Sequence, residues 1–289
     1  MNLLRFSKSS FVFSSFAVAL SILFLVVPGL NLGVDFTGGT ILERQVEDVV
    51  TTSQVRKVLD EAVPQVDLSG AAVQLLDSPN QFVVRTKELD NAEILLIDQA
   101  FEKEFGELVE LRTDLVGPVI GQELIRKALL AVVVASLGIL IYITVRFEYR
   151  FATVAVVALL HDVLIVLGIF ALTGREINSP FVAAVLTVLG YSINDTIVIF
   201  DRIRENLRFR KKESYAEIVN NSLQQSLSRT INTSVTTFIV VFMLVVFGSS
   251  AIRDFAFALL IGIVFGTYSS LMLAGPLWLT WVQMRQKED

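Results

Sequence analysis

Two side chains of opposite charge lie within or beside apolar runs that are long enough to cross a membrane. Asp195 lies inside the run 181–200, and Arg229 opens the run 229–248. A charged side chain well inside a membrane helix costs about 3 kcal/mol on insertion scales, so such residues are rare. The sequence therefore predicts either a site where protonation is coupled to another process or a static ion pair that holds two helices together.

A second ionisable pair, His161 and Asp162, lies midway along the run 151–172. His161 is the only histidine of the chain, and one imidazole does not make a zinc site by itself. The chain also lacks the two-histidine helix motif of metalloproteases, so we expect neither a metal site nor proteolysis. The pair is either an interhelical hydrogen bond or a proton-relay station, and its spacing alone does not decide between them.

Polar residues recur at helical spacing in the two runs that contain Asp195 and Arg229. They are Thr187, Tyr191, Asn194 and Asp195 in the first run, and Arg229, Asn232, Thr233, Thr236 and Thr237 in the second. Polar stripes of this spacing face the interior of a helix bundle. Because burial disfavours a charged carboxylate and a nearby guanidinium favours it, we expect the ionisation of Asp195 to respond to modest rearrangements.

The elements that must position these residues are apolar runs of membrane-spanning length. Hydrophobic residues make up 53% of the 289 residues, which is above the proportion usual for a soluble domain. The runs lie near 11–28, 128–145, 151–172, 180–200, 229–248 and 256–280. Each run is long enough to cross about 30 Å of hydrocarbon. The sequence therefore predicts an α-helical polytopic membrane protein with six transmembrane helices.

The first run follows a short basic head, and a cleaved signal peptide is the alternative interpretation. The run has about 18 residues, however, whereas the apolar region of a signal peptide has about 7–15. No small-residue cleavage pattern follows it. We therefore expect an uncleaved anchor, so that residues 1–29 form a cytoplasmic head and the first helix.

Basic residues in short loops favour one orientation of the six helices. The loops of one side include Arg146 and Arg150, whereas those of the other side include only Arg175 and Arg253. The first side also has a cluster after the fourth helix and a basic tail: Arg202, Arg204, Arg208, Arg210, Lys211, Lys212, Arg285 and Lys287. Because basic loops face the cytoplasm, both termini are predicted to be cytoplasmic.

This orientation places residues 30–122 outside the membrane, as an exterior domain between the first two helices. Residues 123–289 then form a five-helix membrane region with a cytoplasmic hairpin at 201–228 and a cytoplasmic tail. Within the hairpin, the amphipathic segment 213–226 is predicted to lie along the membrane surface. Trp278 and Trp281, near the inner end of the last helix, are predicted to be interfacial anchors.

The exterior segment has the pattern of a small α+β domain. Strands are predicted at 39–47, 71–77, 81–87 and 107–114, and helices at 53–63 and 90–105. The second helix has Asp90 as its N-cap, with Glu93 three residues later, and ends before Gly106. The order βαββαβ predicts a ferredoxin-like fold, which many unrelated functions share.

The composition of the exterior segment limits what it binds. Residues 30–123 contain 18 acidic and 7 basic residues, which argues against binding nucleic acid or anionic lipid there. The segment has no nucleophile–base pair, metal-ligand spacing or phosphate loop. We therefore expect a rigid binding or gating module and no enzyme activity.

Paired glycines follow the first helix, in the sequence that begins at Asp35 and includes Gly38 and Gly39. Glycine adopts backbone conformations that other residues avoid, which suits a tight passage from helix into sheet. On spacing alone this motif is a linker, and two glycines are too few to predict phosphate binding.

These features together resemble the SecF side of the SecD/SecF family, which belongs to the bacterial Sec protein-export machinery and to the resistance-nodulation-division superfamily. The matching stretches are GVDFTGG (33–39), VGPVIG (116–121), RFE (146–148) with RFA (150–152), HD (161–162), GYSINDT (190–196), FDRIREN (200–206) and SRTINTS (228–234). They follow the order of the family through most of the membrane region, whereas the exterior domain matches mainly in position, size and fold.

The resemblance implies a translocase subunit of the bacterial cytoplasmic (inner) membrane, with SecD, the SecYEG channel, translocating unfolded polypeptide and membrane lipid as partners. It implies no cofactor, because the proton gradient, or a sodium gradient, supplies the energy. In the family, the residues matching Asp195 and Arg229 are proposed to line the proton path, and SecD supplies a further acid. The alternatives are half of a proton-coupled small-molecule exporter and a purely structural stabiliser of the translocon.

Overall fold

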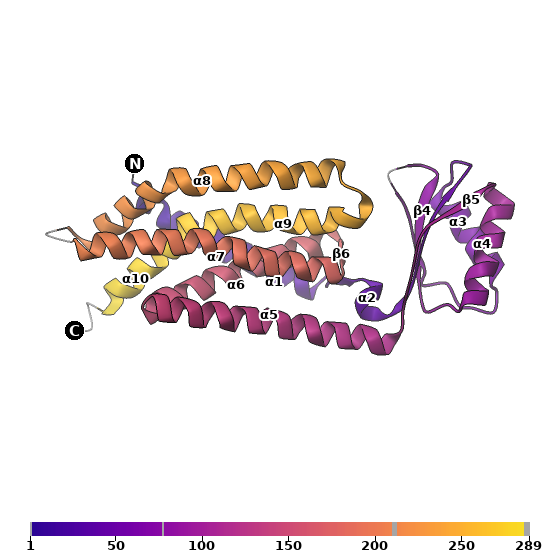
Figure 1. Ribbon diagram of the computed structural model, residues 1–289, viewed down its shortest axis with the longest axis horizontal. Helices are drawn as coiled ribbons and strands as arrows, with labels where there is room; N and C mark the ends of the chain where they lie inside the picture. Colours follow the sequence, from indigo (N-terminus) through magenta and orange to yellow (C-terminus); the bar gives the residue numbers. More distant parts are fainter. Residues whose placement is uncertain (1, 77, 210–212, 286–289) are drawn as a thin grey trace. The chain divides into compact units, whose positions relative to one another are not determined.

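The structure is a computed structural model, and it describes residues 2–76, 78–209 and 213–285 (Figure 1). The chain divides into two compact units, one of Met1–Asn31 with Leu130–Asp289 and the other of Leu32–Leu129. The basic residues Arg210, Lys211, Lys212 and Lys287, which entered the orientation prediction, lie outside the described residues, as does Asp77 of a predicted strand.

The first unit is a bundle of long helices. Its elements are η1 (Leu3–Phe6), α1 (Ser7–Val26), α5 (Pro118–Arg146, which enters it at Leu130), α6 (Tyr149–Thr173), β6 (Glu176–Ile177), α7 (Ser179–Arg208), α8 (Tyr215–Phe247), α9 (Ser250–Ser269), η2 (Ser270–Ala274) and α10 (Gly275–Arg285). Within the described residues, six helical segments are long and apolar enough to cross a membrane. The chain is therefore a helical polytopic membrane protein, which confirms the prediction.

The bundle is held together by close approaches between helix backbones. The helices α7, α8 and α9 pack against one another, and α6 packs against α1 and α9 (Figure 1). A Cβ atom added to Gly168 on α6 would lie 2.4 Å from the side chain of Ser21, and one on Gly262 of α9 would lie 2.1 Å from Val188. Small residues at such crossings let membrane helices pack tightly in the absence of a hydrophobic driving force.

The last membrane segment is not one regular helix. The sequence predicted a single span at 256–280, but a π-helical stretch, η2, separates α9 from α10. Short π-helical stretches leave part of the usual backbone hydrogen-bond ladder unpaired and are frequent at functional sites. Here the stretch begins at Ser270, one residue after Ser269, and both serines are fully buried.

The hairpin between α7 and α8 differs from its prediction, because segment 213–226 does not form a separate surface helix. Helix α8 begins at Tyr215 with a capping box of Ser214 and Glu217, and continues without a break to Phe247. Ile218, Val219 and Leu223 are fully buried. The apolar face of this segment thus packs into the bundle core, which explains why it does not lie along the membrane surface.

Trp278 also differs from its prediction as an interfacial anchor. Its side chain is 3% exposed, and its ring stacks on Phe151 at a centroid distance of 4.8 Å and an interplanar angle of 9°. Trp281, one turn later, remains partly exposed. The difference lies in tertiary contacts, because Trp278 packs among buried residues of the bundle whereas Trp281 lies at the edge of that cluster.

The second unit contains a four-stranded antiparallel sheet, the two longer helices α3 and α4, and the one-turn helix α2. It consists of α2 (Val34–Thr37), β2 (Gly39–Val46), α3 (Thr52–Ala62), β3 (Ala72–Leu75), β4 (Gln81–Thr86), α4 (Asn91–Phe105) and β5 (Leu108–Val116), after the short β1 (Asn31–Leu32). The strand order is β3-β4-β2-β5. Each of the predicted strands and helices is present, and α4 has the predicted capping box of Asp90 and Glu93.

A buried ion pair lies within this unit and was not predicted from the sequence. Arg44 on β2 is 0% exposed, and its Nε and Nη2 donate to the two carboxylate oxygens of Asp98 on α4, at 2.8 and 3.0 Å. Its Nη1 donates to the carbonyl oxygens of Glu43 and Arg112. The register of β2 against β5 shifts between Glu43 and Arg44, which aims the arginine at the helix.

Candidate functional site

Asp195 lies on the face of α7 that points into the bundle, and its side chain is 5% exposed. It accepts one hydrogen bond, from Ser234 Oγ on α8 at 3.5 Å, which is at the long limit for such a bond. Thr267 Oγ1 on α9 lies 2.7 Å from Ser234 Oγ. Among the described residues no cation forms an ion pair with this buried carboxylate.

Arg229 does not form the ion pair that the sequence suggested. It lies on α8, five residues before Ser234, which corresponds to a rotation of about 140° around the helix. Its side chain is exposed, whereas Ser234 is buried against α7 and α9. The two residues of opposite charge are therefore on neighbouring helices, as predicted, but they form no ion pair within the described part of the chain.

Asp162 on α6 is fully buried and well supplied with hydrogen bonds. Its Oδ2 accepts from Ser192 Oγ on α7 at 2.6 Å and from Ser269 Oγ on α9 at 2.8 Å. Its Oδ1 lies 2.9 Å from His161 Nδ1. Of the two interpretations of the pair, the interhelical hydrogen bond is present, because Asp162 joins three helices. The other ring nitrogen of His161, Nε2, is buried with no hydrogen-bond partner within the described part of the chain.

Hydroxyl groups continue the polar layer from Asp162 toward Asp195. Thr196 Oγ1 lies 2.8 Å from Ser270 Oγ, and Ser270 Oγ donates to the carbonyl oxygen of Ser192 at 3.3 Å. Ser192, Asp195 and Thr196 are spaced three and four residues apart, so they share one face of α7. That face contacts α6, α8 and the α9–η2 segment, which makes it the polar centre of the bundle.

Asp162 and Asp195 were predicted as site residues from the sequence, but the hydroxyl residues that surround them were not. These are Ser192, Thr196, Ser234, Thr267, Ser269 and Ser270. A signal was available in the spacing of Ser192, Asp195 and Thr196, and in the adjacent serines at 269 and 270. Single hydroxyl residues are common in membrane helices, however, because they bond to the carbonyl of the preceding turn.

The polar stripe was predicted to face the interior of the helix bundle, but most of its residues are exposed on the surface of this chain. Thr187 and Asn194 on α7 and Asn232 and Thr233 on α8 are exposed in this chain, not interior. Successive residues of a helix are 100° apart, so Asn194 and Asp195 do not share a face. Tyr191 hydroxyl donates to the carbonyl oxygen of Thr233 and joins the two helices at this surface. We call the surface formed by Asn194, Arg229, Asn232, Thr233 and Thr236 the polar face.

The paired glycines form a close-packed connector in the second unit. Gly38 and Gly39 have φ angles of 76° and 138°, which side chains disfavour. A Cβ atom on Gly39 would lie 2.3 Å from the carbonyl oxygen of Thr86, and one on Gly121 would lie 2.7 Å from that of Phe36. Asp35, in the first turn of α2, is half-buried beside them. The motif thus does more than link two elements, because it packs against the residues that lead into α5.

Two family models match the chain over the regions that contain these sites. The C-terminal model of the protein export membrane proteins SecD and SecF matches residues 97–284, and the SecD/SecF GG motif matches residues 23–47. The chain belongs to the SecD/SecF family. The first match covers both membrane acids and the polar face, and the second covers the glycine connector.

Individual members of the SecD/SecF family match nearly the whole chain. The translocase subunit SecF of Sebaldella termitidis is 41% identical over 96% of this chain and 90% of its own length. SecF of Vibrio alginolyticus is 44% identical over 96% of this chain and 88% of its own length. The chain thus matches about nine tenths of the length of these SecF subunits.

Fused members of the family contain a second part in addition to the region that matches. The crystal structure of SecDF from Thermus thermophilus, described as translocon-associated, aligns with 98% of this chain and 39% of its own, at a TM-score of 0.90 and 36% identity. SecDF of Bacillus subtilis is 42% identical over 98% of this chain and 38% of its own length. The chain therefore spans about two fifths of the fused proteins.

Proposed function

We propose that this chain is a SecF-type accessory subunit of the Sec protein translocase, which works with SecD to promote late steps of polypeptide export. The main support is its similarity to SecF subunits over about nine tenths of their length. The proposal requires no cofactor and no catalytic chemistry of the chain's own. It includes the SecYEG channel and unfolded polypeptide as further partners in the cytoplasmic membrane.

SecD is the partner that best fits the polar face. In the fused relatives a SecD part precedes or follows the region that matches this chain, so the two parts occur together. Arg229, Asn194 and Asn232 are exposed on membrane-spanning helices. Exposed charge and amide groups are costly against lipid, whereas polar groups of a neighbouring helix bundle satisfy them. We therefore place SecD against the polar face, with Arg229 at the interface.

The second unit is proposed to be the exterior domain, with a ferredoxin-like fold. The order βαββαβ and the strand order β3-β4-β2-β5 support this assignment. Its excess of acidic residues, and the basic residues in the loops between the membrane helices, support an exterior position with both termini in the cytoplasm. In this position the domain would hold emerging polypeptide and hinder its return.

The coupling step is proposed to be a change in the ionisation of Asp195. Its carboxyl is buried and has one long hydrogen bond, so a proton or an approaching cation is needed to stabilise it. When a proton from the exterior side neutralises the Asp195 carboxyl, the Arg229 guanidinium would remain at the interface with SecD. When the carboxyl loses that proton, its negative charge would attract the guanidinium toward it. Each charge that crosses the membrane supplies about 2.3 kcal/mol per 100 mV, which is enough to bias a conformational equilibrium of a few kcal/mol.

Export into inverted vesicles, with and without an imposed ion gradient, tests this proposal. Asp195→Asn should abolish the stimulation by the gradient at unchanged membrane levels and unchanged assembly with SecD. Asp201→Asn is the matched control, because Asp201 is an acid on the same helix that is 47% exposed and pairs with Arg146. Proton and sodium gradients are imposed separately to identify the ion. Equal stimulation of wild type and Asp195→Asn would leave only a structural role for the chain.

A further inference from the structure

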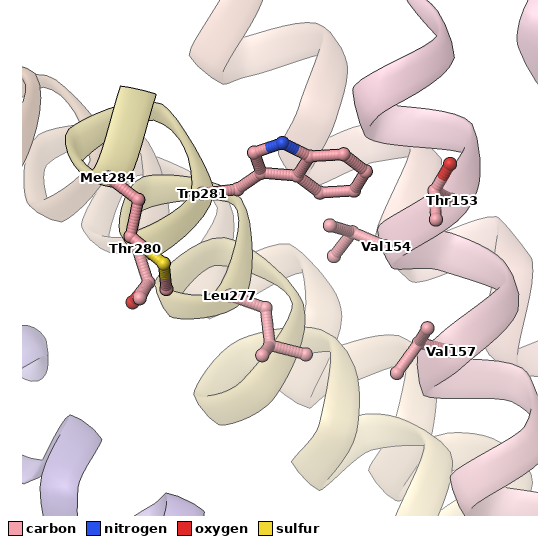
Figure 2. A pocket seen from close by; sticks show the side chains of 7 residues that line it. All are labelled: Thr153, Val154, Val157, Leu277, Thr280, Trp281 and Met284. Carbon is pink, nitrogen blue, oxygen red and sulfur yellow. The ribbon is translucent and has the colours of Figure 1, made fainter. Parts of the chain in front are cut away.

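A groove with a volume of about 360 Å³ lies between α6 and α10 (Figure 2). It is lined by Thr153, Val154, Val157, Leu277, Thr280, Trp281 and Met284. The two threonine hydroxyls donate their protons to carbonyl oxygens of their own helices, at Tyr149 and Pro276. The groove therefore presents an almost wholly apolar surface, although it is large enough for a small-molecule site.

One end of the groove is aromatic and basic. Helix α6 begins and α10 ends at this end, where the rings of Tyr149 and Trp281 meet edge to face at 6.4 Å. Arg150 Nε donates to the hydroxyl of Tyr149, and its guanidinium lies over the same ring. Arg285 follows Trp281 by four residues, which places it on the same side of α10. Glu148, at the N-cap of α6, is the acidic residue nearest in sequence.

The exposed surface around the groove has the composition of a surface that faces lipid. On α6 the exposed residues that follow Thr153 within the next two turns are Val157 and Leu160, at 47% and 54% exposed. The polar face of α7 and α8, in contrast, presents amides, hydroxyls and a guanidinium. Both α6 and α10 belong to membrane-spanning segments, so an apolar groove on this side opens toward acyl chains.

We propose that the groove binds one acyl chain of an anionic phospholipid, whose headgroup lies against Arg150 and Arg285. The apolar lining of the groove would contact the acyl chain, and the two basic residues at one end would pair with the negatively charged phosphate of the headgroup. Aromatic residues such as Trp281 and Tyr149 occur at the boundary between these two regions of a lipid. Basic pockets between membrane helices bind anionic headgroups in the same way. None of the residues that line this groove belongs to the polar face.

Photo-crosslinking in the assembled complex with SecD tests the site. The complex is reconstituted with diazirine-acyl phosphatidylglycerol or, at the same mole fraction, diazirine-acyl phosphatidylcholine, and cross-linked peptides are mapped by mass spectrometry. We expect crosslinks on residues 149–157 and 277–285, with about a fivefold preference for phosphatidylglycerol, the effect of roughly one basic residue near an anionic lipid. Equal crosslinking by the two lipids would show ordinary boundary lipid and would overturn the proposal.

Two variants distinguish the contribution of the lipid headgroup to binding from that of its acyl chain. The double variant Arg150→Gln with Arg285→Gln should reduce crosslinking by phosphatidylglycerol to the level of phosphatidylcholine. The control is the double variant Lys8→Gln with Arg208→Gln, which also loses two positive charges and should keep the preference for phosphatidylglycerol. Val157→Trp fills the groove and should reduce the signals of both lipids, unlike Val133→Trp on the exposed surface of α5. A preference that survives the loss of Arg150 and Arg285 overturns the headgroup assignment. Absence of both lipids from the groove would mean that protein covers it.

Discussion

The two units of the molecule bury charged groups in opposite ways. In the sheet unit, Arg44 is 0% exposed and makes four hydrogen bonds, two of them to the carboxylate of Asp98. In the helical unit, Asp195 is 5% exposed and has one hydrogen bond of 3.5 Å. The charge of Arg44 is thus paired within the chain, whereas the carboxyl of Asp195 has no ion-pair partner among the described residues.

This difference separates a structural charge from one suited to coupling. A buried ion pair with every donor satisfied resists change, because removing either partner leaves the other charge uncompensated. A carboxyl with a single weak partner changes its ionisation at low cost to the fold. Asp162 is intermediate, because it is fully buried but accepts hydrogen bonds from two serine hydroxyls and lies beside His161 Nδ1. Stability and function should therefore respond differently at the three sites.

The largest loss of stability is expected at Arg44. Arg44→Met leaves Asp98 without its partner, and since Asp98 is 20% exposed we expect a loss of about 3 kcal/mol, at the low end for buried pairs. The free energy of unfolding is measured by pulse proteolysis of the full-length protein in detergent. Arg112→Met is the control, because Arg112 is 45% exposed and its pair with Asp114 should contribute less than about 1 kcal/mol.

A second replacement sharpens this comparison. Combining Arg44→Met with Asp98→Leu removes both charges and should recover most of the lost stability, because an apolar pair replaces a desolvated one. If the double variant loses as much free energy of unfolding as Arg44→Met and Asp98→Leu do when their separate losses are added, the ion pair is not the source of the effect. The packing of the arginine stem between β2 and α4 would then be responsible.

The next largest loss is expected at the glycine connector. Gly39→Ala places a Cβ atom 2.3 Å from the carbonyl oxygen of Thr86 at a φ of 138°, so we expect a cost of about 2 kcal/mol. Gly70→Ala is the control, since nothing lies within 4 Å of its added Cβ and its φ is not positive. The same proteolysis assay compares the two. Equal stability of the two variants would show that the connector relaxes without strain.

The sequence predicted those parts of the molecule that depend on local patterns. The six apolar runs, the capping box at Asp90 and the positions of the strands in the sheet unit each follow from residues that are close together in the chain. The predicted location of Asp195 and Arg229 on adjacent helices is also present. Segment 213–226 was placed wrongly, because an amphipathic face does not reveal whether lipid or protein covers it.

The parts that were missed depend on contacts between residues far apart in the chain. Arg44 and Asp98 are 54 residues apart, and Ser269 and Asp162 are 107 apart. A single sequence does not show which serine of one helix faces which acid of another. The orientation of the polar stripe was wrong for a related reason. Helical spacing shows that residues share a face, but not whether that face meets this chain's own bundle or a partner.

A smaller loss is expected at Asp162. Asp162→Asn replaces one acceptor oxygen with a donor group, so one of the bonds from Ser192, Ser269 or His161 is lost, at a cost of about 1 to 2 kcal/mol. Thermal unfolding of the detergent-solubilised protein measures the change. Thr187→Val is the control, because the Thr187 hydroxyl is exposed and bonds only to its own helix, at Ala183. A larger loss in the control would refute a role for Asp162 in joining the helices.

The smallest effect on stability is expected at Asp195, although the largest effect on export is expected there. Asp195→Asn removes at most one long hydrogen bond from Ser234, so the free energy of unfolding should change by about 0.5 kcal/mol or less. Thermal unfolding is measured for the same preparation that is used for export. If stability falls as far as in Asp162→Asn, the carboxylate has a partner that stabilises its charge. A static structural role would then explain any loss of export, and the contrast with Arg44 would fail.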